Sequence, residues 1–273
     1  HPFTLNFNNK DVRITTHYYE KNILSAIFST IHEGGHAIYE QQIDDIVSET
    51  VLGEGTSMGI HESQSRIFEN MFGRNIDFLK NIFNKFDELF DVRSKGIEVE
   101  DFYKIVNTVS KSLIRIEADE LTYPIHIMIR YELEKEIFSN LDEIESSEYI
   151  DYLANKWADM YEEFLGVRPT TNSEGILQDV HWSSGLFGYF PSYALGSAYA
   201  AQIYNSMNKE FSIEENLSNG NFDNINSFLK DKIHKFGKSK TPNELLILAT
   251  GEAFNPDYYI NYLKEKYRKI YGI

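Results

Sequence analysis

Apolar residues recur at helical spacing along most of the chain. The clearest stripe consists of Ile23, Ile27, Ile31 and Ile38, and it predicts a helix over residues 20–42. Further helices are expected, in chain order, over 57–73, 75–91, 98–114, 120–141, 145–165, 191–209, 221–236, 241–250 and 255–271. The pattern therefore predicts a mainly α protein built from many helices.

Segments without helical spacing are few. Residues 1–16 mix β-branched and aromatic residues with turn formers, which predicts an extended segment or a short hairpin. Residues 47–56 favour a strand, a turn and a loop, and two later loops are expected over 166–173 and 180–190. No linker composition interrupts the chain, so we expect a single domain over 1–273.

Composition narrows the class of protein. The chain has 273 residues, of which 42% are hydrophobic and 14% aromatic, and this is enough for a sizeable core. The formal net charge of −16 argues against binding to nucleic acid, whose phosphates need a basic face, and against docking on anionic membranes. No apolar run approaches the roughly 18 residues expected of a membrane span.

Cysteine is absent from the chain. Its absence excludes disulfides and leaves histidine and carboxylate side chains as the ligands for any metal. A reducing cytoplasm is compatible with this usage, and we expect a cytoplasmic protein. The N-terminus has no secretory signal pattern. It also lacks a starting methionine, which favours a processed or truncated chain.

One short motif indicates metal chemistry. Residues 32–36 read His-Glu-Gly-Gly-His within the first expected helix. Positions i and i+4 lie one above the other on a helix face, so His32 and His36 can ligate one ion. Glu33 lies beside the first ligand and can take a proton from a metal-activated water, whose pKa zinc lowers to about 7. The motif alone also occurs in unrelated proteins.

Two further features extend the motif. Gly34 and Gly35 each cost roughly 1 kcal/mol in a helix interior, so we expect close approach of another chain segment or a substrate there. A catalytic zinc needs a third protein ligand, and Glu62 is the candidate; alternatively it is a solvated helix carboxylate. His61 is the rival ligand. It projects about 100° around the helix from Glu62, so the two are not expected to bind together.

Several motifs in order carry a family resemblance. They are His1-Pro2-Phe3, Asp11-Val12-Arg13-Ile14-Thr15, the HEGGH motif at 32–36, the HESQ motif at 61–64, the IRIEAD motif at 114–119 and the GILQDVHW motif at 175–182. With these motifs the chain resembles the thermostable carboxypeptidase (carboxypeptidase Taq) family. The set spans most of the chain and is far more specific than the first motif alone.

The resemblance implies an activity and a fold. Members of the family remove single residues from peptide C-termini with broad specificity and use a divalent metal, zinc or sometimes cobalt. Their fold is a largely helical metallopeptidase fold with a deep active-site groove, and they tend to be homodimers. The resemblance implies metal ligation by His32, His36 and Glu62, with Glu33 as general base, and a small β-hairpin near the metal-binding helices. Members are roughly twice as long, so the chain looks like a C-terminal catalytic half.

Substrate recognition is assigned from the same motifs. Arg115 is the candidate anchor for the substrate C-terminus, and its alternative is a structural salt bridge. Arg13 is a second candidate at the end of the groove; its alternative is a turn-stabilising pair with Asp11. Gln178 and Asp179 are expected to orient the loop that follows them.

The loop around His181 is the candidate for stabilising the reacting carbonyl. We expect His181 to donate to the carbonyl oxygen of the substrate or the tetrahedral intermediate. Related helical zinc peptidases pair such a histidine with a tyrosine roughly ten residues later. Tyr193 fits best and Tyr189 is the alternate, while core packing is the alternative role for each.

Two other functions remain open from the sequence. The first is a related helical zinc endopeptidase or dipeptidase. The second is a metal-binding fragment that is inactive without its N-terminal half. The expected partners are peptides with a free C-terminus and a second copy of the chain, with no nucleic acid and no membrane.

Overall fold

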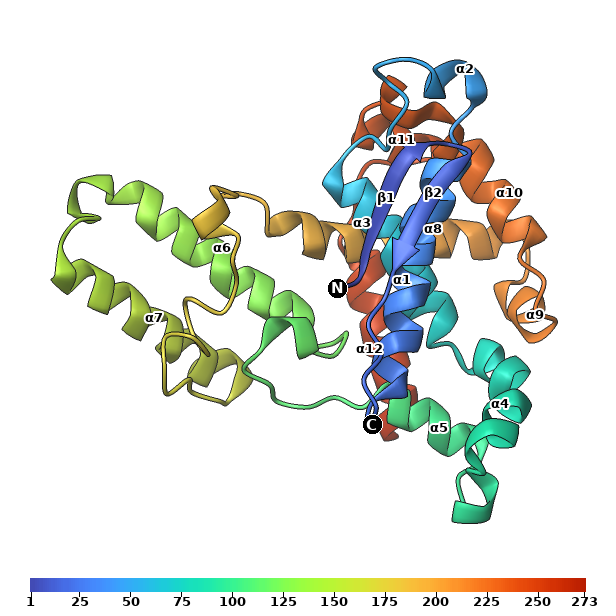
Figure 1. Ribbon diagram of the computed structural model, residues 1–273, viewed down its shortest axis with the longest axis horizontal. Coiled ribbons are helices and arrows are strands. Elements are labelled where there is room, and N and C mark those ends of the chain that lie inside the picture. Colours follow the sequence, from blue (N-terminus) through green and yellow to red (C-terminus); the bar gives the residue numbers. More distant parts are fainter. The chain divides into compact units, whose positions relative to one another are not determined.

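The N-terminal segment forms a β-hairpin. In the computed structural model, which describes residues 1–273, strands β1 (Phe3–Asn8) and β2 (Asp11–Thr15) pair antiparallel in a two-stranded sheet. Phe3 pairs with Thr15 and Leu5 with Arg13, and the register shifts between Asn6 and Asn8. The hairpin lies along helix α1 (Ile23–Gln41) (Figure 1), which confirms the small sheet expected near the first motif.

Helix α1 packs against helix α3 (Met58–Arg66). Both helices begin at polar caps: the side chain of Asn22 accepts from the Ser25 N–H, and that of Ser57 accepts from the Ile60 N–H. Helix α3 continues directly into a π-helix over Ile67–Gly73. The helix expected over 57–73 is therefore confirmed, but its second half is wound more widely than an α-helix.

The remaining helices agree with the apolar spacing in most places. They are α2 (Asp45–Ser48), α4 (Ile76–Phe90), α5 (Val99–Val106), α6 (Tyr123–Ser139), α7 (Ser147–Leu165), α8 (Pro191–Glu210), α9 (Ile213–Ser218), α10 (Asp223–Lys232), α11 (Pro242–Thr250) and α12 (Asp257–Tyr271). Twelve α-helices and one small hairpin make a mainly α fold, as expected. None of these helices combines the length and apolar character that a membrane-crossing segment needs.

Three local predictions were wrong. Residues 47–56 hold no strand; the Asp44 side chain caps the short helix α2 instead, and turns follow it. The helix expected over 98–114 ends at Val106, because the Asn107 side chain donates back to the Tyr103 carbonyl at 2.9 Å. Helix α9 was not expected; the Ser212 side chain accepts from the Glu215 N–H and starts it.

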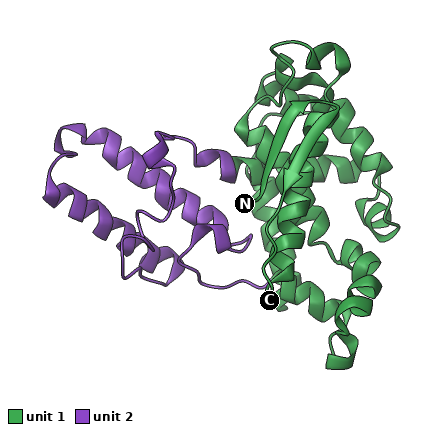
Figure 2. Ribbon diagram, viewed as in Figure 1, with its two compact units in different colours: residues 1–107, 195–273 green, residues 108–194 purple.

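The chain divides into two compact units (Figure 2). Residues 1–107 and 195–273 form unit 1, and residues 108–194 form unit 2. The largest core of unit 1 joins Ile60, Ile67 and Met207, among others. The sequence shows no linker at either boundary, and the expectation of one catalytic domain stays a prediction.

Unit 2 is built on the contact between helices α6 and α7. Trp157 and Tyr161 are buried on α7, and Ile129 and Leu133 face them from α6. His126 is buried in the same unit, with its Nδ1 2.8 Å from the Tyr161 hydroxyl. Burial, followed by the Arg115 charge, lowers the pKa of His126 to about 4.

The burial of His126 leads us to expect that the folded protein loses stability in acid. An unfolded chain protonates its histidines near pH 6.5, whereas folded His126 stays neutral down to about pH 4. Between these values the unfolded state binds more protons, so stability falls as pH falls. From about pH 7 to about pH 4.5, the metal-free protein should lose about 2 kcal/mol more unfolding free energy than His126→Asn. Urea unfolding at both pH values measures this, and equal losses in the two proteins would contradict it.

Candidate active site

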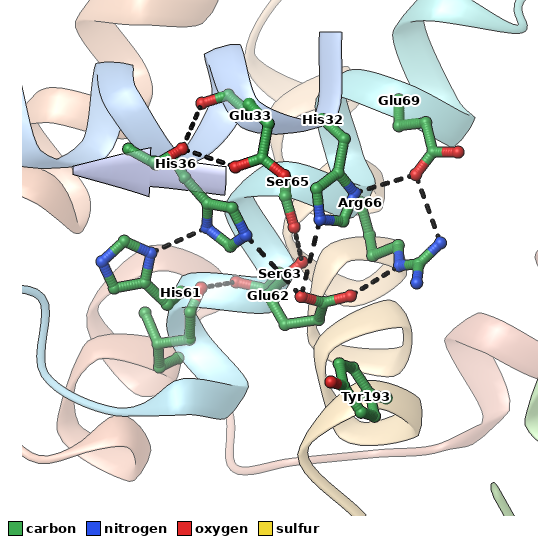
Figure 3. A network of polar contacts seen from close by, with 12 residues as sticks. His32, Glu33, His36, His61, Glu62, Ser63, Ser65, Arg66, Glu69 and Tyr193 are labelled. Carbon is green, nitrogen blue, oxygen red and sulfur yellow. Dashed lines mark hydrogen bonds and ion pairs between the residues drawn. The ribbon is translucent and has the colours of Figure 1, made fainter. Parts of the chain in front are cut away.

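Helices α1 and α3 bring three ligand-type side chains together in unit 1 (Figure 3). Nε2 of His32 and Nε2 of His36 each lie 3.8 Å from Oε2 of Glu62. One ligand atom from each residue lies within 4.8 Å of the other two. The two histidines are one helical turn apart on α1, and Glu62 faces them from α3.

The three side chains fit a divalent metal. Zinc bonds of about 2.0–2.2 Å place ligand atoms about 3.3–3.6 Å apart around a tetrahedron. The separations of 3.8 Å from Glu62 need to close by only a few tenths of an ångström, and all three ligand atoms lie within 4.8 Å of one another. Two imidazoles and one carboxylate leave the fourth position open, as in catalytic rather than structural zinc sites.

Charged partners surround the ligands. Nδ1 of His32 lies 2.9 Å from Oε2 of Glu69, a residue of the π-helix. Arg66 donates to Oε1 of Glu62 at 2.7 Å and to Oε2 of Glu69 at 3.2 Å. Arg74 donates to the other oxygen of Glu69. One arginine therefore ties the ligating carboxylate to the carboxylate that orients His32.

These contacts shift the pKa values of the site. Burial raises the pKa of Glu69, but Arg66, the bond from His32 and Arg74 outweigh it and hold that pKa well below its ordinary value. Burial lowers the pKa of His32, but Glu62 and Glu69 outweigh it and raise it. Burial, followed by the charge of His32, holds the pKa of His36 well below its ordinary value. The carboxylates that favour a proton on His32 also favour a metal cation beside it.

The candidate general base is held by the hairpin. Glu33 is buried on α1, and the Thr4 hydroxyl of β1 donates to its Oε2 at 2.6 Å. Two residues along the strand, Asn6 donates to Glu40 of the same helix. The sequence analysis missed Thr4 and Asn6. The signal that could have found them is the alternation of polar residues along β1, which places both on one face of the strand.

Two glycines set the spacing of the helices. A Cβ on Gly35 would lie 2.6 Å from the Gln64 carbonyl oxygen and 2.8 Å from the Ser65 Cα, so only glycine allows α3 this close. A Cβ on Gly196 of α8 would lie 2.6 Å from both Cβ and Cγ of Glu62. Around Gly34 there is open space. The close approach expected at the glycine pair is therefore confirmed at Gly35.

The two motifs of unit 2 bond to each other. Arg115 donates from Nη2 to Asp179 at 2.8 Å and from Nη1 to the Tyr123 hydroxyl at 2.9 Å. Its backbone N–H donates to the Gln178 side chain at 2.8 Å. The Arg115 side chain is buried, and Tyr123 and Asp179 raise its pKa despite the opposing effect of burial. This is the ion pair that the structural alternative describes, and the anchor role of Arg115 stays a prediction.

His181 and Tyr193 lie together within unit 2. Nε2 of His181 is 3.2 Å from the Tyr193 hydroxyl. The Tyr189 ring is 5.4 Å from the His181 ring between centroids. Burial, followed by the Arg115 charge, lowers the pKa of His181, so the ring is neutral at neutral pH. A neutral ring carries one N–H, which it can donate to an oxygen. The catalytic roles of these residues stay predictions.

Arg13 lies in the hairpin of unit 1, with an exposed side chain. Its Nε and Nη2 each donate to a carboxylate oxygen of Asp11 at 2.7 Å. The guanidinium also lies 5.0 Å from the Phe7 ring centroid. The pair with Asp11 is the one that the structural alternative describes, and contact of Arg13 with a substrate stays a prediction.

A helix bearing His-Glu-x-x-His, with a glutamate supplied by a second helix, is typical of helical metallopeptidases. A family model described as "Carboxypeptidase Taq (M32) metallopeptidase" matches residues 1–267, and the chain belongs to this family. It is 49% identical to Carboxypeptidase 1 of Bacillus subtilis (strain 168) over 272 residues, which cover 99% of this chain and 53% of that protein. It is 42% identical to Thermostable carboxypeptidase 1 of Pyrococcus furiosus over 268 residues, covering 98% of this chain and 52% of that protein.

Solved structures agree with this assignment. The M32 carboxypeptidase from Deinococcus radiodurans R1 superposes with a TM-score of 0.94 at 39% identity, covering 100% of this chain and 54% of the other. A crystal structure called BsuCP superposes with a TM-score of 0.90 at 49% identity, covering 99% and 53%. The chain thus spans about half the length of the relatives it matches.

The contact between Gly196 and Glu62 yields a prediction. Gly196→Ala should push the Glu62 carboxylate away from the histidines and lower zinc affinity by about 10-fold or more, as loss of ligand support does elsewhere. Gly34→Ala is the matched control, because its methyl group enters open space and should leave zinc affinity unchanged. Competition with a chromophoric chelator measures both affinities. Equal affinities in the two variants would contradict the role of Gly196.

Proposed function

We propose that this chain is the catalytic part of a zinc-dependent carboxypeptidase that hydrolyses the C-terminal peptide bond of peptides. The convergence of His32, His36 and Glu62, with Glu33 beside the first ligand, carries the proposal. Family membership supports it, because the family is one of metallopeptidases and its relatives are named carboxypeptidases. Cobalt or another divalent ion is compatible with the same ligands.

Glu33 is the proposed general base. Zinc, when bound, lowers the pKa of a water and polarises the substrate carbonyl. Glu33 then takes the proton from the attacking water and passes it to the departing amine. The hydrogen bond from Thr4 to Oε2 of Glu33 fixes the side chain, and the other carboxylate oxygen remains for this proton transfer. Thr4 is thus a positioning residue for the base.

His181 is proposed to donate a hydrogen bond to the carbonyl oxygen as negative charge develops on it. Its lowered pKa supports a neutral ring with one N–H, and the Tyr193 hydroxyl at 3.2 Å supports Tyr193 as its partner. Tyr189 is the alternate tyrosine, supported by the tilted contact between its ring and that of His181.

Arg115 is proposed to recognise the terminal carboxylate of the substrate. A guanidinium has five N–H groups, and Asp179 and Tyr123 accept from three of them. Two N–H groups are therefore left to bind a carboxylate. Asp179 and Gln178 hold the arginine by its side chain and backbone in this proposal, and Arg13 is a second candidate.

We also propose an assembly, a location and a class of substrate for the protein. Peptides with a free C-terminus are the proposed substrates, a homodimer is the proposed assembly, and the cytoplasm is the proposed location. Because the relatives are about twice as long, the activity of the whole protein is proposed from the family and not from this chain alone.

A peptide digest tests the reaction. Zinc-loaded protein incubated with a short peptide should release residues one at a time from the C-terminus, as followed by mass spectrometry. The same peptide with an amidated C-terminus should be cut far more slowly, because the anchoring carboxylate is missing.

Equal cleavage of both peptides would contradict the carboxypeptidase and favour an endopeptidase. Release of dipeptides would favour a dipeptidase. Zinc binding with turnover at background would favour a fragment that is inactive by itself.

Replacing the base separates chemistry from metal binding. Glu33→Gln has the shape of glutamate but cannot take up a proton, so kcat should fall by at least about 100-fold, the contribution typical of general base catalysis. Zinc affinity should stay near the wild-type value, because Glu33 is not one of the ligands. Steady-state kinetics and metal titration measure the two effects, and wild-type kcat in this variant would rule out Glu33 as the base.

A further inference from the structure

The two ligating histidines have different partners on their far sides. Nδ1 of His32 meets the Glu69 carboxylate directly, at 2.9 Å. Nδ1 of His36 meets another imidazole instead, the Nδ1 of His61 at 2.8 Å (Figure 3). The Nε2 of His61 then lies 2.5 Å from Oε1 of Glu40, a buried carboxylate on α1. His61 therefore connects His36 to a carboxylate one step further away.

The hydrogen positions from His36 through His61 to Glu40 follow from the proposed metal site. If His36 offers the Nε2 lone pair to the metal, its single proton lies on Nδ1. Two Nδ1 atoms 2.8 Å apart share one hydrogen bond, so His61 must accept with Nδ1. The proton of His61 then lies on Nε2, where it is donated to Glu40. Both ring nitrogens of His61 are used, and none remains to bind metal.

Three hydrogen-bond donors hold the Glu40 carboxylate, and His61 is the first of them. Oε1 of Glu40 also accepts from the Gly55 N–H at 3.0 Å, and its Oε2 accepts from the Asn6 side chain of β1. A buried carboxylate without such donors would be strongly destabilising. All three partners donate to Glu40, so the site matches an ionised carboxylate.

The backbone also leaves room for the His61 ring. A Cβ on Gly55 would lie 2.6 Å from Cδ2 of His61 and 2.7 Å from the Tyr39 ring. Tyr39 packs against His61 with ring centroids 4.9 Å apart, and its hydroxyl accepts from the Thr56 N–H. The His61 ring is thus confined between Tyr39 and Gly55, where no larger residue fits. This confinement fixes the orientation of the His61 ring.

We propose that His61 and Glu40 are positioning residues that fix the tautomer and ring orientation of His36 for metal binding. Asn6 of the hairpin and the Gly55 N–H hold Glu40 in place. The inference rests on the proposed metal site and deepens it. Such partners of ligating histidines typically change metal affinity 10- to 100-fold.

Two substitutions at one position test the role of His61. His61→Phe keeps the ring shape but offers no acceptor, so zinc affinity should fall about 10- to 100-fold. His61→Asn can present its Oδ1 near the place of Nδ1, so it should bind zinc more tightly than His61→Phe. Affinity is measured by chelator competition, and the visible spectrum of the Co²⁺ form reports ligand geometry.

Two further variants test Glu40. Glu40→Met removes every acceptor from this position and should weaken zinc binding about 10-fold or more. Glu40→Gln keeps one oxygen for the His61 N–H, while the Asn6 amide can turn its own oxygen to the new NH₂ group, so this variant should bind zinc more tightly than Glu40→Met. Wild-type zinc affinity in Glu40→Met overturns the role of Glu40 beside His61.

His126→Phe is the matched control, because it removes another buried histidine, one that belongs to unit 2. It should keep wild-type zinc affinity, and thermal unfolding of each metal-free variant shows that it folds. Wild-type affinity in His61→Phe, or equal losses in His61→Phe and His61→Asn, overturns the inference. If the wild-type protein itself binds no zinc, the proposed metal site fails instead, so the two failures are distinct.

Discussion

The contact between α1 and α3 at Gly35 is the constraint on which the candidate site depends. The backbone of α3 at Gln64 and Ser65 approaches so closely that no side chain fits between the helices. That approach brings Glu62 to the two histidines of α1. Gly196 brings α8 equally close to the Glu62 side chain. The three ligand residues are thus held by two helix contacts that only glycine allows. Arg66 then fixes the direction of the Glu62 side chain, and Glu69 fixes that of His32.

Much of this could be predicted from local spacing. The i, i+4 histidines share a helix face wherever that helix forms, and the apolar stripe at Ile23, Ile27 and Ile31 predicts that helix. The angle of about 100° between Glu62 and His61 predicts that the two do not ligate together, and the family resemblance implies that Glu62 is the ligand. The structure places Glu62 with the histidines and His61 against Glu40. The costly glycine pair likewise predicts a close contact within this helix.

The rest depends on tertiary partners that spacing does not encode. The polar alternation along β1 indicates that Thr4 and Asn6 share a face of the strand. It does not indicate that they reach Glu33 and Glu40, because these contacts span 29 and 34 residues. Gly196 acts through the side chain of Glu62, which lies even further away along the chain. The early end of α5 has the same origin: Asn107 also donates to the Arg74 carbonyl, so a distant segment competes with helix continuation. The bonds of Arg115 to Asp179 and Gln178 likewise join motifs more than 60 residues apart.

The π-helix at Ile67–Gly73 has a consequence for how this chain can vary. Its wider turns accommodate more residues than an α-helix of equal length, and Arg74 N–H bonds to the Glu69 carbonyl five residues back. Deleting one residue here would let the segment return to α geometry, and the helix after it would keep roughly its direction, because the residue removed is the one that the wider turns add. Within the segment, however, the deletion would change the direction of the Glu69 side chain, which now contacts His32 on one side and Arg74 on the other. The extra residue of the π-helix therefore sets the direction of Glu69 rather than the course of the chain after it.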